Sequence, residues 1–326
     1  MMPAHSNNVL TLSELLHGIA AVDARDDCEV FGLASDSRKV KKGDCFVALS
    51  GTRSHGVQFA HQAIAAGAVA VLIEDVELAL GGSIPVIRID RLRKELGRIA
   101  GRFYGDPSQS LDVIAVTGTN GKTTVALLCA QSLKRLHGDA GYAGTLGIGR
   151  LGDLSETATT TPDPITLHEF FSNLRNHASR GAAIEVSSHA ISQSRVVGVA
   201  IDVAILTNIG HDHLDYHGTR EAYIEAKKSL FANEDLEHAV INIDDDVGRE
   251  LAEELSAKTR CWTYSSRTKI SGRSDARHLY LTRFAGDIGG STVAVATPQG
   301  EVEITTPLIG DFNAQNIVAS LGALMA

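Results

Sequence analysis

A glycine turn followed by Lys-Thr-Thr gives the clearest indication of chemistry in this chain. The run is Thr117-Gly118-Thr119-Asn120-Gly121-Lys122-Thr123-Thr124, and it joins an apolar stretch that begins at residue 112 to an apolar helix pattern after residue 124. Backbone N–H groups of such a loop point at an anion, and the helix dipole favours negative charge there. Lys122 can reach the outer phosphates of a nucleotide, and the Thr123 hydroxyl can bind Mg²⁺. The run predicts binding of ATP or a similar nucleotide.

This loop departs from the common phosphate-binding pattern, G-x-x-x-x-G-K-[ST]. Val116 occupies the place of the first glycine, and the nearer Gly118 gives a tighter G-x-x-G-K-T. The plain alternative is a glycine turn between a core strand and a helix, with Lys122 in solvent. The strand–turn–helix context that the motif requires is present and favours phosphate binding.

Glu185 ends another apolar strand pattern, Ile184-Glu185-Val186, which leads into Ser187-Ser188-His189. An unpaired carboxylate inside an apolar strand is costly. A metal ion near the phosphates would explain this residue. A structural glutamate held in a salt bridge is the alternative, since buried acids are rare unless they are paired.

A third strand pattern leads into Gly210-His211-Asp212-His213-Leu214-Asp215-Tyr216-His217. The histidines invite a zinc interpretation, but the spacing H-x-H-x₃-H matches no common structural zinc pattern and no cysteine joins it. Mg²⁺ or a phosphate is the favoured partner of one histidine. On the next helix pattern Lys227 or Lys228 could bind phosphate or lie in solvent, and the sequence pattern alone does not choose between them.

Two further polar groups precede helix patterns. The hydroxyls of Thr159, Thr160 and Thr161 could cap a helix or bind a substrate. Asn313 could be a helix N-cap. Asn313 and Asn316 are three residues apart and share a helix face, so they could also contact a base edge.

The composition is that of an ordinary globular protein. The 326 residues are enough for about two domains, with 44% hydrophobic and 21% charged residues. The net charge of −9 argues against general nucleic-acid binding. Four cysteines form no C-x-x-C pair, and Cys45 and Cys129 lie in apolar runs that indicate buried free thiols and a reducing compartment. No signal peptide or transmembrane run is present in the sequence, so we expect a cytoplasmic protein.

Two α/β domains are expected, residues 1–108 and residues 109–326. The first has strand patterns at 30–33, 45–49, 69–73 and 85–89 and helix patterns at 11–19 and 57–66, with Thr11 and Glu14 in capping-box positions. Residues 103–110 indicate a linker. The second is predicted to be a doubly wound, mostly parallel sheet with its ligands at the carboxyl ends of the strands. Residues 280–306 predict accessory antiparallel strands.

Together these segments resemble the Mur ligase family of ATP-dependent amide-forming enzymes. Five segments carry the resemblance in the family's order: Thr117–Thr124, Glu185–His189, Thr207–Gly218, Ala226-Lys227 and Gly310–Asn316. The first of them is highly specific to the family. In the first domain, Asp36-Ser37-Arg38, Gly43–Ala48 and His55-Gly56 resemble the family's UDP-binding domain. The resemblance covers essentially the whole chain.

The resemblance implies a role for each matching residue. The implied ATP-binding residues are Gly118, Thr119, Asn120, Gly121, Lys122, Thr123, Thr124 and, at adenine, Asn313. Thr123 and Glu185 are implied ligands of one Mg²⁺. His213 and Lys227 are implied to lie at a second Mg²⁺. Lys227 matches a lysine that is carbamylated in the family. Thr160, Thr161, Ser187, Gln193 and Arg195 match contacts to the muramoyl dipeptide, and Ser35, Ser37 and His55 are candidates for the UDP end.

The implied reaction adds the third amino acid, meso-diaminopimelate or L-lysine, to UDP-N-acetylmuramoyl-L-alanyl-D-glutamate through an acyl phosphate in peptidoglycan synthesis. Its cofactors would be ATP and Mg²⁺, and its catalytic residues Lys122, Glu185, His213 and Lys227. We expect a monomer. The alternatives are another ligase of the Mur or folylpolyglutamate type, and a non-catalytic module that binds the UDP precursor.

The family's C-terminal domain is expected to be absent from this chain. The sequence stops inside an apolar helix pattern that starts near Asn313. That pattern favours truncation, although a helix that simply closes the domain is the alternative. A chain lacking the closing domain is expected to bind the precursor but to ligate poorly.

Overall fold

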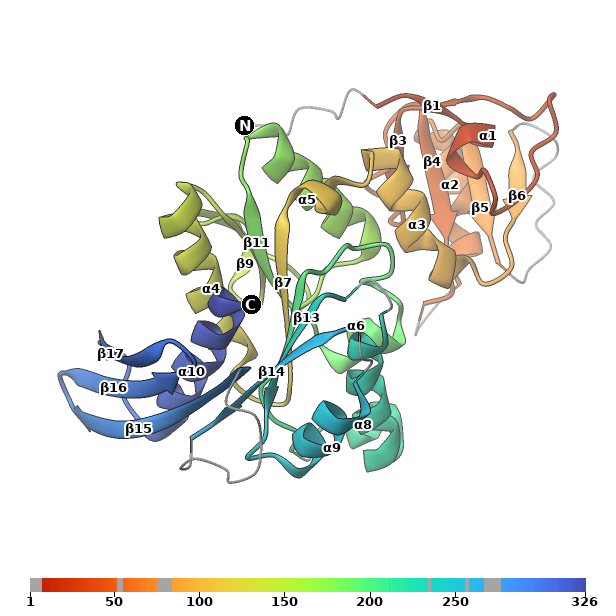
Figure 1. The fold of residues 1–326 in the computed structure, drawn as a ribbon. Coiled ribbons are helices and arrows are strands. Elements are labelled where there is room, and N and C mark those ends of the chain that lie inside the picture. Colours follow the sequence, from red (N-terminus) through yellow and green to blue (C-terminus); the bar gives the residue numbers. More distant parts are fainter. Residues whose placement is uncertain are drawn as a thin grey trace. The chain divides into compact units, whose positions relative to one another are not determined.

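The computed structural model describes residues 8–51, 55–74, 84–210, 212–233, 236–255, 258–266 and 277–326, which divide into two compact units (Figure 1). The first unit comprises the described residues of Met1–Pro107 with Asp163–Asn173 and Gln193–Val199, and the second holds the rest. The division falls inside helix α5 (Pro164–Asn176). The domain boundary near residue 108 stays a prediction.

A four-stranded parallel sheet in the order β3-β4-β5-β6 forms the centre of the first unit. Side chains alternate between its faces. Cys45 and Val47 of β4 join the core beneath helices α1 and α3, whereas Phe46 and Ala48 join the core beneath α2. The elements are β1 (Leu10–Thr11), α1 (Leu12–Leu15), β2 (Glu29–Val30), β3 (Gly32–Ala34), β4 (Asp44–Ala48), η1 (Gly56–Phe59), α2 (Ala60–Ala65), β5 (Ala70–Ile73), β6 (Val86–Arg88) and α3 (Leu92–Tyr104).

Three sequence-based assignments in this unit are wrong. The strand expected at 30–33 is divided at Phe31, because Val30 pairs with β1 while Gly32 pairs with β4. The first helix has its predicted capping box but ends at Leu15 rather than at residue 19. The segment assigned to a linker contains the buried end of α3, Phe103 and Tyr104, followed by the short helix η2 (Pro107–Ser110).

The second unit is built on an eleven-stranded sheet in the order β10-β9-β8-β11-β7-β12-β13-β14-β15-β16-β17. The strands from β8 to β15 in that order run parallel, which confirms the predicted mostly parallel sheet. Its strands are β7 (Asp112–Thr117), β8 (Gly141–Gly144), β9 (Gly147–Arg150), β10 (Asp153–Ser155), β11 (Gly181–Glu185), β12 (Val203–Leu206), β13 (His238–Asn242), β14 (Arg260–Ser265), β15 (His278–Asp287), β16 (Gly290–Thr297) and β17 (Gly300–Thr306).

Helices cover both faces of this sheet, as a doubly wound fold requires. On β13, Val240 faces Gly322 of α10, while the next residue, Ile241, faces Gly248 of α9. Helix α10 also packs against α4, and both contribute to one hydrophobic core cluster (Figure 1). The helices are α4 (Lys122–His137), α6 (Ser188–Ser192), α7 (Leu214–His217), α8 (Arg220–Lys228), η3 (Ser229–Ala232), α9 (Asp246–Glu254) and α10 (Asp311–Met325).

The predicted antiparallel strands are β15, β16 and β17, and they extend the central sheet instead of forming a separate one. Residues Thr263–Ser265 of β14 pair in parallel with the start of β15, and β16 and β17 follow as antiparallel neighbours. The sequence patterns did not predict β14, the parallel strand β8, or the strands β9 and β10, which extend β8 at the other edge by antiparallel pairing.

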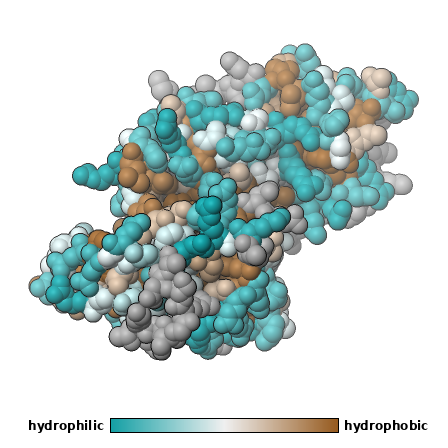
Figure 2. Space-filling view, viewed as in Figure 1, coloured by the Kyte–Doolittle hydropathy of each residue, from teal (hydrophilic) through white to brown (hydrophobic). Residues whose placement is uncertain are grey.

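The face of the molecule drawn in Figure 2 is mainly hydrophilic. Figure 2 shows polar side chains over most of the visible face, with hydrophobic side chains in smaller patches. Within the described residues, no helix is both long and apolar enough to span a membrane. Cys45 and Cys129 are buried and free, as predicted.

Candidate nucleotide and metal site

The glycine loop lies at the carboxyl end of β7, between β11 and β12. This is the edge of a parallel sheet at which ligands bind in α/β folds. Gly118 and Gly121 have φ values of 146° and 84°, a region that favours glycine. A Cβ atom on Gly118 would collide with the Thr207 hydroxyl, and one on Gly121 would lie 2.5 Å from the Asn316 side-chain oxygen. The loop therefore requires both glycines for conformation and for space.

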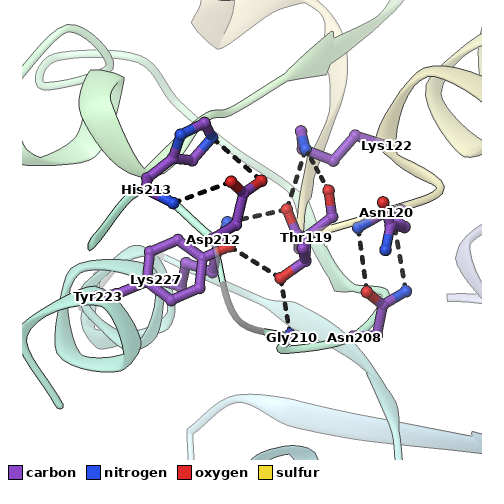
Figure 3. Close-up of polar contacts among 10 residues, drawn as sticks. Thr119, Asn120, Lys122, Asn208, Gly210, Asp212, His213, Tyr223 and Lys227 are labelled. Atoms are coloured by element: carbon purple, nitrogen blue, oxygen red, sulfur yellow. Dashed lines mark hydrogen bonds and ion pairs between the residues drawn. The ribbon is translucent and has the colours of Figure 1, made fainter. Parts of the chain in front are cut away.

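Asn208, which follows β12, holds the loop in shape. Its side-chain oxygen accepts a hydrogen bond from the backbone N–H of Asn120 at 3.0 Å, and its amide donates to the backbone carbonyl of Asn120 at 3.1 Å. The hydroxyl of Thr119 contacts the Tyr223 hydroxyl at 2.8 Å and accepts from the backbone N–H of Gly210 at 2.7 Å. Figure 3 shows these contacts closing around the loop.

Helix α4 starts at Lys122 immediately after the loop, and within the described chain no side chain caps it. Its first N–H groups therefore remain able to bind an anion, which the helix dipole also favours. The Lys122 ammonium folds back onto the loop and donates to the carbonyl oxygens of Gly118 and Thr119 at 3.0 and 2.9 Å (Figure 3). Burial lowers the pKa of Lys122, and the charge of Glu185 partly offsets this.

Glu185 at the end of β11 is only 1% exposed and is surrounded by oxygen and nitrogen donors. Thr123 donates to its Oε2 at 2.9 Å, and Tyr142 of β8 donates to its Oε1 at 2.5 Å. Thr145 donates its backbone N–H to Oε1 at 2.8 Å. Among the described residues Glu185 forms no ion pair, so the salt-bridged alternative finds no support. A hydroxyl and a carboxylate beside a phosphate loop are oxygen ligands of the kind that Mg²⁺ prefers, and these residues therefore fit that ion.

Thr161 and Ser187 are linked to the backbone of Glu185, and Thr160 is linked to Thr145, which donates to the Glu185 carboxylate. The Thr161 hydroxyl donates to the backbone carbonyl of Glu185 at 2.8 Å and accepts from the backbone N–H of Ser187 at 3.0 Å. Thr145 donates to the Thr160 hydroxyl at 3.3 Å. The proposal that these threonines cap the following helix is wrong, because Asp163 accepts from the N–H groups of Ile165 and Thr166.

The structure distinguishes the two adjacent lysines of α8. Lys227 is 2% exposed and donates to the Gly118 carbonyl at 2.8 Å. Its ammonium also lies 4.7 Å from the centre of the Tyr223 ring. Burial, followed by the charge of Lys122, lowers the pKa of Lys227 to about 7. Lys228 instead forms an ion pair with Glu254 at 2.8 Å.

His213 lies in an aromatic cluster beside these lysines. Its Nε2 is 3.4 Å from the Asp212 carboxylate (Figure 3), and its ring centre is 4.8 Å from that of His189. His189 also contacts Tyr216, with ring centres 4.1 Å apart. Within the described residues no group of His, Cys, Asp and Glu side chains is arranged to hold a metal ion by itself. His211 of the same motif lies outside the described residues.

Asn313 and Asn316 lie on one face of α10, as predicted. The Asn316 amide donates to the Asn313 side-chain oxygen at 3.1 Å, and Asn313 donates to the carbonyl of Ile309 at 2.9 Å. Helix α10 begins at Asp311 with Gly310 at its N-cap, so Asn313 is not the N-cap. Asn316 is the residue that faces Gly121 of the glycine loop.

The other candidate residues belong to the first unit. Ser35 is exposed, and Ser37 is buried with its hydroxyl donating to the Gln62 side chain at 2.9 Å. His55 accepts from the N–H of Val57 at 3.2 Å and caps η1. Arg195 donates to the Gln193 side-chain oxygen at 2.7 Å, and both residues are half-buried. The ligand-binding roles of all these residues stay predictions.

Sequence reasoning missed four residues that shape the site: Tyr142, Thr145, Asn208 and Tyr223. One of them leaves a signal, because Tyr223 lies four residues before Lys227 and so shares its helix face. Tyr142 and Thr145 leave none, since they reach Glu185 from β8, a strand that the sequence did not predict, and from the turn directly after it.

Comparisons with known proteins identify the family of this chain. Residues 116–324 match the Mur ligase middle domain, and residues 29–104 match the Mur ligase family catalytic domain. A UDP-N-acetylmuramoyl-L-alanyl-D-glutamate–2,6-diaminopimelate ligase from Pseudomonas syringae pv. tomato is 44% identical over 90% of this chain and 59% of its own length. The ligase of the same name from Pseudomonas aeruginosa is 43% identical over 93% of this chain and 61% of its own length.

Solved structures give the same fold. A structure of a UDP-N-acetylmuramoyl-L-alanyl-D-glutamate–2,6-diaminopimelate ligase superposes with a TM-score of 0.79 at 33% identity, covering 96% of this chain and 63% of that one. MurF from Acinetobacter baumannii shares the fold at a TM-score of 0.69 and 20% identity, over 98% of this chain and 66% of that chain. The chain thus spans about three fifths of the length of the curated relatives named above. Because the middle-domain match alone covers residues 116–324, the chain belongs to the Mur ligase family.

Proposed function

We propose that this protein acts as an ATP-dependent ligase that joins 2,6-diaminopimelate to the D-glutamyl side-chain carboxylate of UDP-N-acetylmuramoyl-L-alanyl-D-glutamate. The curated relatives at 43–44% identity carry the name of this activity. They support diaminopimelate over lysine, a choice that the sequence alone leaves open. Because the chain spans 59–61% of their length, the activity of the whole relative is inferred for this protein.

The observation that carries the proposal is the burial of Lys227 against the phosphate loop. Its amine, 2% exposed with a pKa lowered to about 7, is largely neutral at slightly alkaline pH. Only a neutral amine reacts with CO₂ to form a carbamate, so desolvation prepares this lysine for carbamylation. A simple nucleotide-binding loop has no need of a buried amine at this place.

The proposed residue roles are those that the resemblance to the Mur ligase family implies. The loop amides of Gly118–Thr124 and the Lys122 ammonium would hold the ATP phosphates, and Asn313 would contact adenine. Thr123 and Glu185 would hold one Mg²⁺, and His213 with carbamylated Lys227 a second. The dipeptide would contact Thr160, Thr161, Ser187, Gln193 and Arg195, and the UDP end Ser35, Ser37 and His55.

The proposed reaction has two steps. A carboxylate oxygen of the D-glutamyl side chain attacks the γ-phosphorus of ATP, ADP leaves and an acyl phosphate forms. The diaminopimelate amine then attacks the acyl carbon, and phosphate leaves from the tetrahedral intermediate. Lys122 offsets charge on the transferring phosphoryl group. Bound Mg²⁺ would supply further charge stabilisation at the phosphate oxygens.

Two alternatives are less well supported. A non-catalytic binding module would need neither the Thr123–Glu185 pair nor a buried lysine beside the loop. Ligases of the MurF and folylpolyglutamate type share the fold, but at 20% identity in the structures compared. The cytoplasmic location and monomeric state expected from the sequence stay predictions.

The direct test is release of ADP by the purified protein with ATP, Mg²⁺ and the UDP-muramoyl dipeptide, with either diaminopimelate or lysine. Release that requires diaminopimelate would support the proposal, whereas release that requires lysine would change the third substrate. Binding of the UDP precursor without any release would favour the binding module. If the protein binds neither ADP nor the UDP precursor, the diaminopimelate ligase, the alternative ligases and the binding module are all contradicted.

A second test concerns Lys227 directly. Protein equilibrated with ¹³C-bicarbonate at pH 8 should show a carbamate carbon signal by NMR. The signal should persist in Lys228→Ala, which alters a neighbouring lysine that pairs with Glu254, and disappear in Lys227→Ala. A signal that survives in Lys227→Ala would place the carbamate on another amine.

A further inference from the structure

The two oxygens of the Glu185 carboxylate have different surroundings. Oε1 accepts from the Tyr142 hydroxyl at 2.5 Å and from the Thr145 N–H at 2.8 Å. Oε2 accepts from the Thr123 hydroxyl at 2.9 Å and from the Thr145 hydroxyl at 3.3 Å. Only Oε2 therefore lies beside the first residues of α4, where the nucleotide phosphates are proposed to bind.

We propose that Tyr142 is a positioning residue that occupies Oε1 of Glu185, so that the carboxylate offers a single oxygen, Oε2, to a divalent cation and the site selects Mg²⁺ over larger cations. This inference rests on the proposed function, because it assumes that a cation binds with the nucleotide. It gives a task to a tyrosine whose hydroxyl donates directly to the Glu185 carboxylate.

The placement of Tyr142 suits this task. The side chain is fully buried in the core cluster beneath α4, which leaves the ring little freedom. It lies on β8, the strand next to β11, with Ala183 as its paired residue. A phenol is protonated near neutral pH, so the hydroxyl is the donor in its bond to the carboxylate. A short bond from a fixed ring thus determines the orientation of Glu185.

Cation size provides the expected selectivity. Mg²⁺ requires near-ideal octahedral geometry at about 2.0–2.1 Å, which a carboxylate best meets through one oxygen. Ca²⁺ accepts longer distances, more ligands and bidentate carboxylates. Removing the Tyr142 hydroxyl would free a lone pair on Oε1 and make bidentate binding available. The discrimination between the two ions should then decrease.

The test compares the protein with Tyr142→Phe, which keeps the ring. Tyr264→Phe is the matched control, because among the described residues the contacts of this buried hydroxyl are to the backbone carbonyls of Leu206 and Thr207, at 3.3 and 3.4 Å. With ADP present, bound Mn²⁺ is displaced by Mg²⁺ or by Ca²⁺ and followed by electron paramagnetic resonance. The ratio of the Ca²⁺ to the Mg²⁺ dissociation constant should fall at least about tenfold in Tyr142→Phe, as expected for one charge-assisted hydrogen bond, and stay unchanged in Tyr264→Phe.

If Tyr142 has a purely structural role, Tyr142→Phe should weaken the binding of both ions equally and leave the ratio unchanged. That result would overturn this inference but not the proposed function. Tyr142→Met, which removes the hydroxyl while keeping an apolar side chain, should give the same fall in the ratio; a Met variant with the ratio of the unmodified protein would also count against it. If the unmodified protein binds no cation with ADP, the proposed function fails and the inference fails with it. The two failures are therefore distinguishable.

Discussion

Lys227 and Lys122 donate hydrogen bonds to the same atom, the backbone carbonyl oxygen of Gly118, at 2.8 and 3.0 Å. Two ammonium groups at one carbonyl disfavour each other's charge. The effect is larger for Lys227, because burial has already lowered its pKa and the charge of Lys122 lowers it further, to about 7. In the absence of ligand, the site therefore holds a lysine that is close to losing its proton at neutral pH.

This pKa predicts that the stability of the protein rises with pH between about 7 and 10.5. In that window the unfolded chain keeps the Lys227 proton and the folded chain releases it, so raising the pH favours folding. Burying the protonated Lys227 side chain lowers the free energy of unfolding by the full amount below pH 7 and not at all above pH 10.5. From the size of the pKa shift, this loss is on the order of 3–5 kcal/mol. Urea unfolding at pH 6.5, 8 and 9.5 in CO₂-free buffer measures it.

Lys227→Met is the informative variant for this prediction, because it keeps the volume of the side chain and removes the titrating amine. Its stability should be flatter across the window than that of the unmodified protein. Lys228→Met, which changes the neighbouring ion-paired lysine, should keep the original slope. Equal slopes in all three proteins would mean that Lys227 does not carry the proton.

Gly144→Ala should disturb the proposed metal site by a steric clash, without straining the backbone. The φ angle of Gly144 is not positive, so alanine can adopt its backbone conformation. A Cβ atom there, however, would collide with Glu185 Oε1 and with the Tyr142 hydroxyl. We expect a loss of about 1–3 kcal/mol in the free energy of unfolding, typical of overpacking, and weaker Mg²⁺-dependent ADP binding by calorimetry.

Gly289→Ala, in the exposed turn after β15, is the control for this substitution. A Cβ atom on Gly289 meets only the end of the Asp287 side chain, at 3.2 Å. This variant should have the stability and ADP affinity of the unmodified protein. If Gly144→Ala binds ADP in the presence of Mg²⁺ as well as the unmodified protein does, the position of the Glu185 carboxylate is not important for metal binding.

Asn208→Ala should weaken nucleotide binding without unfolding the protein. The side chain makes two hydrogen bonds to the backbone of Asn120, at 3.0 and 3.1 Å, and shapes the loop from outside it. Two neutral hydrogen bonds at about 0.5–1.5 kcal/mol each correspond to a rise of roughly 5- to 150-fold in the dissociation constant of ADP. Asn176→Ala, at the exposed end of α5, should leave the affinity unchanged. An affinity loss shared by both variants would contradict a specific role for Asn208.

The nucleotide loop could be predicted because its parts are contiguous in the sequence. The apolar strand, the two glycines and Lys122 form one run, and each follows a local physical requirement. Glu185 could be predicted for a similar reason, since a carboxylate at the end of an apolar strand needs a partner. The identity of that partner could not be predicted, because Tyr142 meets Glu185 only through the pairing of β8 with β11.

Glycines required by tertiary contacts explain several missed elements. Helix α3 contains Gly97 and Gly101, which lower its helix propensity. A Cβ atom on Gly97 would collide with the carbonyl of Val197, and one on Gly101 would approach His168. Strand β8 reads Gly-Tyr-Ala-Gly and shows no β-branched run. For Gly97 and for Gly144 of β8, the contact that leaves no room for a side chain comes from far away in the sequence, from Val197 and from Glu185.

His168 leads to the last prediction, in the first unit and at acid pH. The side chain on α5 is fully buried, and burial is the main cause that lowers its pKa from 6.5 to about 4. Between these values the unfolded chain binds the proton and the folded chain does not, so stability falls as the pH falls through this window. The loss should be on the order of 3 kcal/mol by pH 4. His168→Leu should reduce this acid sensitivity in urea unfolding at pH 4.5, 5.5 and 7, while the change His177→Leu at an exposed position should not. Because this window lies below that of Lys227, the two effects can be measured in one pH series, and an unaltered acid slope in His168→Leu would assign the acid sensitivity to other groups.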